Sequence, residues 1–334
     1  MSLQRYQGCI VGLAVGDALG YPAEFRSRSL LLSLLGENAL FDFVGINDSV
    51  FAGVPPYIFG AEHPPGSFTD DTQMSLCVAE ALLRSWDASL PELMKDMARH
   101  FVAWSQSPEN DRAPGSSCMT GCENLSQGLP WYEAGVAQSK GCGSAMRVAP
   151  IGLVYSSNRR RLLEVARASS LPTHGHDAAV EGAAAAALLV AMALEGASPE
   201  MMWEHVLQEC GPRSSDFREC WETLPAFLSE PPEKALSKDG LGEGWVAEEA
   251  VASALYCYWR HPNDFVAAVH MAALTDGDSD TLACITGGIS GAALGLEALP
   301  LSWRQRVEQS DRLHEVGAQL WEAAQRVQRQ TQGL

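Results

Sequence analysis

Two short acidic segments crowd carboxylate and hydroxyl side chains at the start of helix-spaced apolar runs. Residues 69–72 have the sequence Thr-Asp-Asp-Thr, and residues 276–281 have the sequence Asp-Gly-Asp-Ser-Asp-Thr. Oxygen ligands of this kind suit hard divalent cations such as Mg²⁺, Mn²⁺ and Ca²⁺. If the fold brings the segments together, they can hold two cations about 4 Å apart, a pair that activates a water and polarises substrate oxygens.

Each acidic segment also has a simpler interpretation as a helix N-cap, because Thr and Asp oxygens accept bonds from free N–H groups at a helix start. Capping explains one acid in each segment, but two adjacent acids in the first and three in the second exceed that need. An EF-hand loop beginning at Asp276 is excluded. Its sixth position would be Thr281 where glycine is required, and its twelfth would be Gly287 where glutamate is required.

Two glycine-containing segments add candidate polar groups. Glu24 follows the glycine-rich run 12–20 and is a candidate acid, base or cation ligand, the alternative for that run being a tightly packed helix end. Residues 141–144 (Gly-Cys-Gly-Ser) could hold an anion through backbone N–H groups. Arg147 could add charge there or support the acidic segments. The alternative for residues 141–144 is a plain turn.

Zinc is the weaker metal hypothesis. Cys118 and Cys122 form a single Cys-x-x-x-Cys pair, and no second paired ligand motif follows. His174 and His176 precede an alanine-rich helix, where packing or ligand contact is the commoner role and Asp177 serves equally as a cap.

The elements that must position these groups are helices. Apolar residues recur at three- and four-residue steps, whereas strand-like alternation occurs only in the short run 41–46. The chain is therefore predicted to be all-α, with long loops at 48–68, 107–144 and 211–244, the last carrying one short helix. The charged stretch 302–330 is predicted to be a solvated helical cap. The predicted helical segments are 69–84, 91–104, 162–168, 178–194, 200–208, 246–259, 265–274, 282–294 and 301–327.

Composition restricts the class of protein. With 334 residues, 46% hydrophobic and 19% charged, the chain can form a large core without disulfides. Its 23 basic and 41 acidic residues give a net charge of −18, which argues against non-specific binding to nucleic acid or to anionic membranes. The longest apolar run, 182–194, is too short to span a bilayer and predicts a buried helix.

The N-terminus and the cysteines indicate the cellular compartment of the protein. The N-terminus lacks the pattern of a targeting segment, and nine cysteines, an odd number, lie mostly in apolar helical patterns. We therefore expect a cytoplasmic protein.

Five segments in this order resemble the ADP-ribosylglycohydrolase family, which includes dinitrogenase-reductase-activating glycohydrolase and the ADP-ribosyl-acceptor hydrolases. The matching motifs span residues 12–295, nearly the whole chain: GLAVGDALGYPAEF, GSFTDDTQM, GCGSAMRVAPIGL, THGH with AVEGAAAA, and DGDSDT before a glycine-rich helix. The resemblance implies one compact, bundle-like, all-α domain over residues 1–334, a monomer, and a centre of two divalent cations, Mg²⁺ or Mn²⁺.

The resemblance also implies roles for individual residues. The implied cation ligands are Thr69, Asp70, Asp71, Asp278, Asp280 and Thr281. The implied catalytic residues are Glu24, on a loop over the cations, with Asp71 and Asp280. Gly141, Gly143 and Ser144 would line the path of the diphosphate, and His174 the nucleoside side. Asp276 stands where the family more often has glycine and is left out, and the loop 242–245 is implied to lie near the ligand.

One position departs from the family pattern: Cys142 stands where many members carry asparagine. The implied activity is hydrolysis of the glycosidic bond that joins ADP-ribose to an acceptor, such as an arginine side chain of a protein. The implied partner is accordingly an ADP-ribosylated protein or a small molecule containing ADP-ribose. Two alternatives remain open, a two-metal phosphoester hydrolase and a non-catalytic ADP-ribose binder or toxin-blocking immunity protein. The intact acidic segments favour catalysis.

Overall fold

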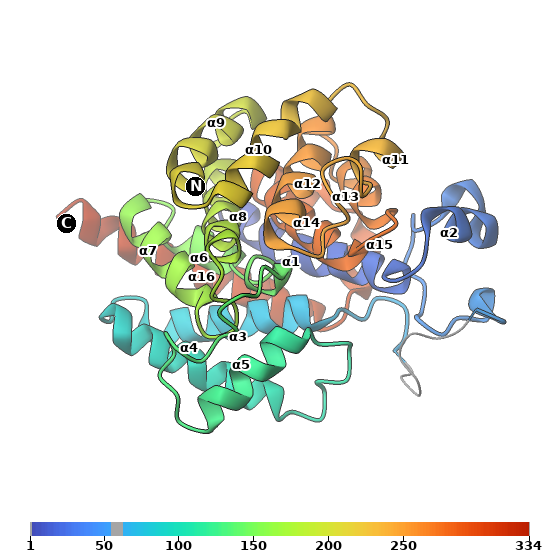
Figure 1. Cartoon of the computed structure of the whole chain (residues 1–334). Coiled ribbons are helices and arrows are strands. Elements are labelled where there is room, and N and C mark those ends of the chain that lie inside the picture. Colours follow the sequence, from blue (N-terminus) through green and yellow to red (C-terminus); the bar gives the residue numbers. More distant parts are fainter. Residues whose placement is uncertain (1, 55–62, 334) are drawn as a thin grey trace.

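A computed structural model describes residues 2–54 and 63–333, and these residues fold into an all-helical single domain (Figure 1). The helices are α1 (Leu3–Gly20), α2 (Arg28–Leu35), α3 (Asp70–Ser85), α4 (Leu90–Ser105), α5 (Ser116–Ser126), α6 (Ala149–Val154), α7 (Arg159–Ser170), α8 (Asp177–Glu195), α9 (Pro199–Cys210), α10 (Ser215–Phe227), α11 (Pro232–Ala235), α12 (Ala247–Arg260), α13 (Phe265–Ala273), α14 (Ser279–Leu294), α15 (Leu301–Arg306) and α16 (Ser310–Thr331). The all-α prediction is confirmed. The strand candidate 41–46 is wrong, since that run forms bends, coil and the start of a turn.

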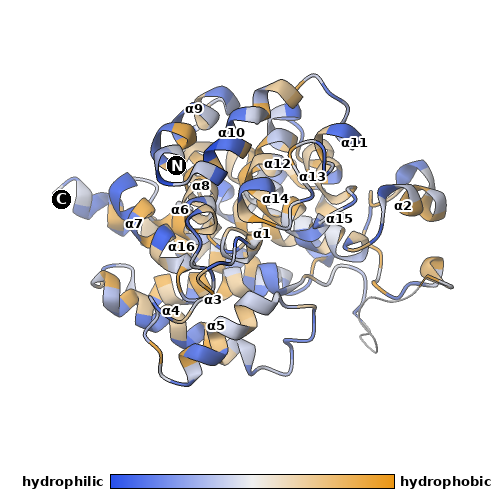
Figure 2. Ribbon diagram, viewed as in Figure 1, coloured by the Kyte–Doolittle hydropathy of each residue, from blue (hydrophilic) through white to orange (hydrophobic). Residues whose placement is uncertain are grey.

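The core is formed by apolar helices that other helices surround. Figure 2 shows hydrophobic residues concentrated on the inner helices and on the inward faces of the outer ones. Residues 182–194 of α8 are all buried, as the alanine-rich run predicted. Although α8 is long and apolar enough to cross a membrane, 89% of its most apolar stretch lies inside this fold, as expected for a core helix.

Glycines let α1 and α14 pack with their backbones almost in contact. A Cβ atom added at Gly8, Gly12 or Gly16 of α1 would lie 2.0–2.5 Å from a carbonyl oxygen of α14. Added at Gly287 of α14, it would lie 2.1 Å from the Gly12 carbonyl oxygen. The tight packing considered for the run 12–20 is thus confirmed. It brings the C-terminal end of α1 against the N-terminal end of α14, where the second acidic segment lies.

The predicted single helix over 301–327 is wrong in one respect, because the chain breaks between α15 and α16. Gln309 adopts a left-handed backbone conformation (φ 53°), and the Glu308 N–H donates to the Gly66 carbonyl oxygen at 2.9 Å. The Glu308 carboxylate accepts a bidentate bond from Arg112. These contacts to distant segments replace the helical bonds at the break.

The other differences lie at the C-terminus and in the predicted loops. Helix α16 is more than a solvated cap, since its apolar face is buried and Gly317 packs against Gln7 of α1. The predicted loop 107–144 contains α5, and the predicted connection 211–244 contains α10 as well as the short α11. Part of the predicted loop 48–68 lies outside the described residues.

Candidate functional site

The first acidic segment begins helix α3, where it supplies the helix cap and a buried carboxylate oxygen without a hydrogen-bond partner. Thr69 is the N-cap, and its hydroxyl oxygen accepts a bond from the Asp71 N–H at 3.3 Å. Asp70 and Asp71 occupy the first turn and are buried. Asp71 Oδ1 is buried without a hydrogen-bond partner, which is costly for an anionic oxygen unless a cation balances it.

The second acidic segment begins helix α14. Asp278 is its N-cap and accepts from the Thr281 N–H at 3.3 Å, while Asp280 lies in the first turn with its Oδ1 buried and unpartnered. Asp276 is exposed, and its Oδ1 accepts from the Arg28 N–H at 2.7 Å. The structure therefore keeps Asp276 out of the acidic cluster, in agreement with its omission from the implied ligands.

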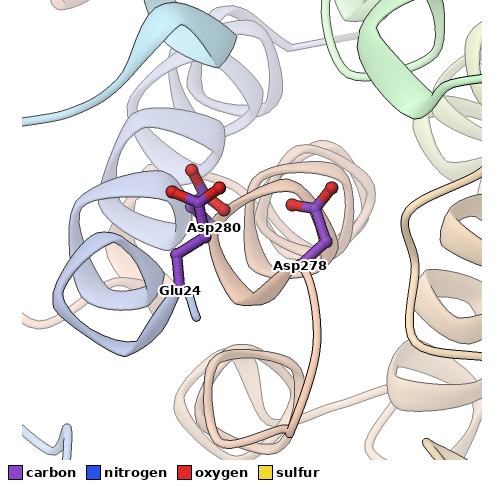
Figure 3. A group of neighbouring side chains, drawn as sticks. All are labelled: Glu24, Asp278 and Asp280. Carbon is purple, nitrogen blue, oxygen red and sulfur yellow. The ribbon is translucent and has the colours of Figure 1, made fainter. Parts of the chain in front are cut away.

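Glu24 approaches the second segment from the C-terminal end of α1, which lies against the N-terminal end of α14. One ligand atom each from Glu24, Asp278 and Asp280 lie within 4.8 Å of one another, and all three side chains are buried (Figure 3). Glu24 directly follows the short helical turn Tyr21–Ala23 that continues α1, and its N–H donates to the Gly20 carbonyl oxygen at 3.1 Å. Within the described residues, this is the one group of three or more His, Cys, Asp or Glu side chains with metal-ligand spacing.

The ionised form of these carboxylates is unfavourable in the metal-free protein, because they are buried close to one another. Burial, followed by repulsion from neighbouring carboxylates, raises the pKa values of Asp70, Asp71 and Asp280 well above the ordinary value. Burial also raises the pKa of Asp278. A cluster of this kind holds protons or binds cations near neutral pH. The residues present therefore fit the divalent cations that the resemblance implies.

Sequence reasoning missed Asp17, which joins the two halves of the site from within α1. It is fully buried, and its carboxylate accepts from the Thr69 and Thr72 N–H groups at 2.9 and 3.0 Å and from the Thr72 hydroxyl at 2.5 Å. Burial and the nearby Asp280 raise its pKa to about 7. The available signal was a single acid inside an otherwise apolar, glycine-rich helix.

The clusters open into a cleft of about 290 Å³. Its walls include Glu24, Asp70, Asp71, Gly141, Gly143, His174, Asp278, Asp280 and Thr281, together with Phe25, Cys142 and Trp245. Phe25 and Trp245 stack with ring centroids 5.0 Å apart, so the 242–245 loop does lie beside the site. A larger cavity of about 770 Å³ between α4, α5 and the 129–132 segment has no carboxylate in its lining, so it offers no site for a hard cation.

Two implied site residues do not reach the cleft. Ser144 is fully buried, and its hydroxyl donates to the Ala179 carbonyl oxygen at 3.1 Å. Thr69 is also fully buried and serves as the α3 cap beside the acids. In the glycine loop, the Gly141 N–H donates to Ser139 Oγ at 3.4 Å and the Cys142 N–H donates to the Trp245 carbonyl oxygen at 3.3 Å. Two of the backbone donors expected to face an anion are thus already bonded within the protein.

Cys142, the departure from the family pattern, contacts the acidic cluster directly. Its thiol donates to Asp278 Oδ2 at 2.9 Å and lies 3.9 Å from the Thr281 hydroxyl. The side chain therefore holds one carboxylate in place at the edge of the cleft.

The zinc hypotheses find no support in the described part of the chain. Cys118 faces the Arg147 guanidinium at 3.8 Å, and His176 is the N-cap of α8 through a bond from the Ala178 N–H to Nδ1. Neither the Cys118–Cys122 pair nor the His174–His176 pair belongs to a group of metal-ligand spacing.

Comparisons with known proteins find similarity along nearly the whole chain. A profile of the ADP-ribosylglycohydrolase family matches residues 2–330. The chain is 32% identical to a protein of Archaeoglobus fulgidus over 97% of this chain and 98% of that protein. It is 29% identical to the mouse ADP-ribosylhydrolase ARH3 over 92% of this chain and 88% of the relative. It is 26% identical to the ADP-ribosylarginine hydrolase Tri1 of Pseudomonas putida over 98% of this chain and 80% of the relative.

A solved structure with a similar fold is described as an ADP-ribosylglycohydrolase-related protein complex. It superimposes with a TM-score of 0.72 at 27% sequence identity, and the match covers 96% of this chain and 98% of that chain.

Proposed function

The chain belongs to the ADP-ribosylglycohydrolase family, and from that premise we propose that it hydrolyses the glycosidic bond between ADP-ribose and a modified acceptor with the help of two divalent cations. The acceptor we propose is a protein side chain, with arginine the first candidate because one relative is named an ADP-ribosylarginine hydrolase.

One observation supports this proposal most strongly: carboxylates far apart in the sequence converge at one cleft with buried oxygens left unpaired. Glu24, Asp278 and Asp280 lie together, and Asp71 and Asp280 each have a buried oxygen without a partner. Mg²⁺ or Mn²⁺ would be held by Asp70, Asp71, Asp278, Asp280 and Thr281, with Thr69 beside them. Such cations, when bound, supply positive charge that stabilises oxygens at the reacting centre.

The remaining chemistry belongs to the chain's own groups. Hydrolysis needs a group that takes a proton from the attacking water, and a carboxylate placed beside that water can do so. Asp71 and Asp280 line the cleft and are the carboxylates that we propose for this transfer. Charge that develops on an oxocarbenium-like ribose would be stabilised by neighbouring carboxylates such as Glu24.

The test is incubation with Mg²⁺ or Mn²⁺ and a panel of ADP-ribosylated substrates that carry arginine, serine or nucleobase acceptors, followed by mass spectrometry. Intact ADP-ribose and free acceptor should be the products, and EDTA should abolish their release. AMP or ribose 5-phosphate as the primary product would instead establish a phosphoester or phosphoanhydride hydrolase. Tight ADP-ribose binding without turnover of any substrate would establish a binding protein.

We also propose that the protein acts as a monomer in the cytoplasm. All nine cysteines are free thiols, which is compatible with a reducing compartment. Light scattering tests the oligomeric state, and thiol counting on protein purified under anaerobic conditions tests the redox state.

A further inference from the structure

Arg147 is a fully buried cation whose hydrogen-bond partners carry no negative charge. Its Nη2 donates to the Ser169 carbonyl oxygen at 2.9 Å and to Thr173 Oγ1 at 2.7 Å. Its guanidinium carbon lies 4.4 Å from the centroid of the Phe101 ring. Arg147 is absent from the cleft lining and contacts neither acidic segment through these bonds. The two roles expected of it from the sequence, anion binding and support of the acids, therefore leave this costly burial unexplained.

The chain of contacts leads from Arg147 to His174. Thr173 Oγ1 lies 2.7 Å from His174 Nδ1 as well as 2.7 Å from the Arg147 nitrogen. A guanidinium group has only donors, so Thr173 Oγ1 must accept from Arg147. The single hydroxyl hydrogen of Thr173 is then available for one other partner.

Two acceptors lie near that hydrogen, and their distances from Thr173 Oγ1 show which of them it bonds to. The Ser170 carbonyl oxygen lies 3.4 Å away and already accepts from the Thr173 and His174 N–H groups at 3.0 and 2.8 Å. His174 Nδ1 lies 2.7 Å away. The nearby cation also polarises the hydroxyl group and makes it a better donor. The Thr173 hydroxyl therefore donates to Nδ1, and the imidazole carries its proton on Nε2.

We propose that Arg147 and Thr173 are positioning residues that hold His174 as the Nε2–H tautomer, so that the cleft presents a fixed, uncharged hydrogen-bond donor. The imidazole lies against the glycine loop, since a Cβ added at Gly141 would be 3.0 Å from Nε2 and one added at Gly143 would be 3.0 Å from Cε1. The ligand group that fits beside it is an acceptor oxygen or ring nitrogen. For ADP-ribose as that ligand, the inference rests on the proposed function, whereas the tautomer does not.

Two consequences follow for the reaction. A histidine with its proton on the cleft-facing nitrogen cannot act there as a general base, so proton removal stays with the carboxylates. Burial and the charge of Arg147 lower the pKa of His174 to about 3, so the ring is neutral at working pH and does not compete with cations for the acids.

The first test measures the tautomer in the intact protein. Nitrogen-15 labelling of histidine and long-range proton–nitrogen correlation spectra at pH 7 distinguish a protonated from an unprotonated ring nitrogen. His174→Gln assigns the resonance among the eight histidines. We expect a bare Nδ1 and a protonated Nε2. A protonated Nδ1 or a doubly protonated ring in the wild type would overturn the proposal without any variant.

The second test uses variants that differ at one hydroxyl. Thr173→Val removes the hydroxyl at nearly constant shape, and we expect loss of the single tautomer and about tenfold weaker binding of ADP-ribose by calorimetry. Thr173→Ser should restore both. Ser170→Ala is the matched control, because the Ser170 hydroxyl donates to the His174 carbonyl oxygen at 2.9 Å and does not touch the imidazole.

The outcomes separate this inference from the proposed function. If the wild type has the Nε2–H tautomer and Thr173→Val loses it, but ADP-ribose binds to neither, the positioning role stands and the proposed ligand is wrong. If Thr173→Val keeps the wild-type tautomer, or if Ser170→Ala disturbs it equally, the hydroxyl of Thr173 does not set the tautomer and the inference fails.

Discussion

At the scale of single residues, the site is a set of buried carboxylates whose negative charges repel one another and which a bound cation would balance. Asp280 lies at the centre of this balance, since it has an unpartnered oxygen and neighbours Asp278 and Glu24 (Figure 3). We expect Asp280 to weaken the metal-free fold and to serve the proposed function, because active-site residues commonly lower stability.

Asp280→Asn tests that trade. We expect catalysis to disappear and calorimetric affinity for Mg²⁺ and Mn²⁺ to fall by at least tenfold, because a neutral amide is a poorer ligand for a hard cation. The melting temperature without metal should equal or exceed that of the wild type, since a source of repulsion is gone. Asp276→Asn is the control, because Asp276 is exposed and outside the cluster. Unchanged cation affinity in Asp280→Asn would contradict the two-metal centre.

Glu24→Gln keeps the size of the side chain and removes its charge. We expect kcat to fall by roughly a hundredfold or more, as for loss of one well-placed charged group in an active site, while ADP-ribose still binds. Steady-state kinetics and calorimetry measure the two effects separately. The exposed Glu37 provides the control Glu37→Gln, which should match the wild type. A wild-type kcat in Glu24→Gln would assign Glu24 a structural role only.

The lowered pKa of His174 determines whether the free energy of unfolding rises or falls with pH. The pKa of His174 is lowered to about 3 in the folded protein. Below pH 6.5 the unfolded chain therefore binds a proton at this residue that the folded protein does not bind. Stability contributed by neutral His174 is therefore present above pH 6.5 and is lost as the pH falls. Relative to His174→Gln, the wild type should lose up to about 1.4 kcal/mol of unfolding free energy per pH unit between pH 6.5 and 5. Urea titrations at several pH values measure this difference, and parallel curves would show that His174 is not neutral in the fold.

At the scale of elements, the packing of α1 against α14 sets the geometry of the site. The glycines of α1 recur every fourth residue, so they form a ridge without side chains that faces the small residues of α14. This contact places Asp17 and Glu24 beside the N-terminal turn of α14. A change in the separation of these two backbones would move Asp17 and Glu24 relative to Asp280 of α14.

Two adjacent glycines of α14 test this close approach. In Gly287→Ala the new Cβ would lie 2.1 Å from the Gly12 carbonyl oxygen, so we expect a loss of about 1–3 kcal/mol in unfolding free energy. In Gly288→Ala the nearest atom would be the Leu13 Cβ at 3.6 Å, and the better helix propensity of alanine should leave stability unchanged or slightly higher. Urea denaturation compares the two variants. Equal effects would mean that the two backbones do not approach so closely.

At the scale of the whole molecule, the cluster links segments that are distant in the chain. Its carboxylates come from the end of α1, the start of α3 and the start of α14, so a bound cation joins parts of the fold that separate on unfolding. Cation binding should therefore stabilise the entire domain rather than one loop.

Differential scanning calorimetry with added Mn²⁺ or Mg²⁺ measures this linkage. At a hundredfold excess over the dissociation constant we expect about 2.7 kcal/mol of added stability and a melting temperature higher by several degrees. EDTA should reverse the shift, and K⁺ at equal ionic strength should not reproduce it. Absence of any shift would mean that divalent cations do not bind the folded state preferentially.

The sequence alone determined the features that arise from a few neighbouring residues. Apolar residues at helical spacing predicted most of the helices, and the Thr-Asp-Asp-Thr and Asp-x-Asp-Thr segments predicted the acidic first turns of two helices. The glycine-rich run 12–20 also indicated a tightly packed helix end. Each of these signals depends on local backbone geometry and side-chain chemistry, which the order of residues specifies directly.

Tertiary structure decided which of those features meet. No local pattern shows that Gly12 packs on Gly287, that Asp17 caps the start of α3, or that Ser144 turns away from the cleft. The contacts from Arg147 through Thr173 to His174 could not be predicted from the sequence either, because they join a turn before α6 to the segment after α7. Such contacts depend on how whole helices pack together, and many pairings of similar apolar faces would satisfy the same sequence pattern.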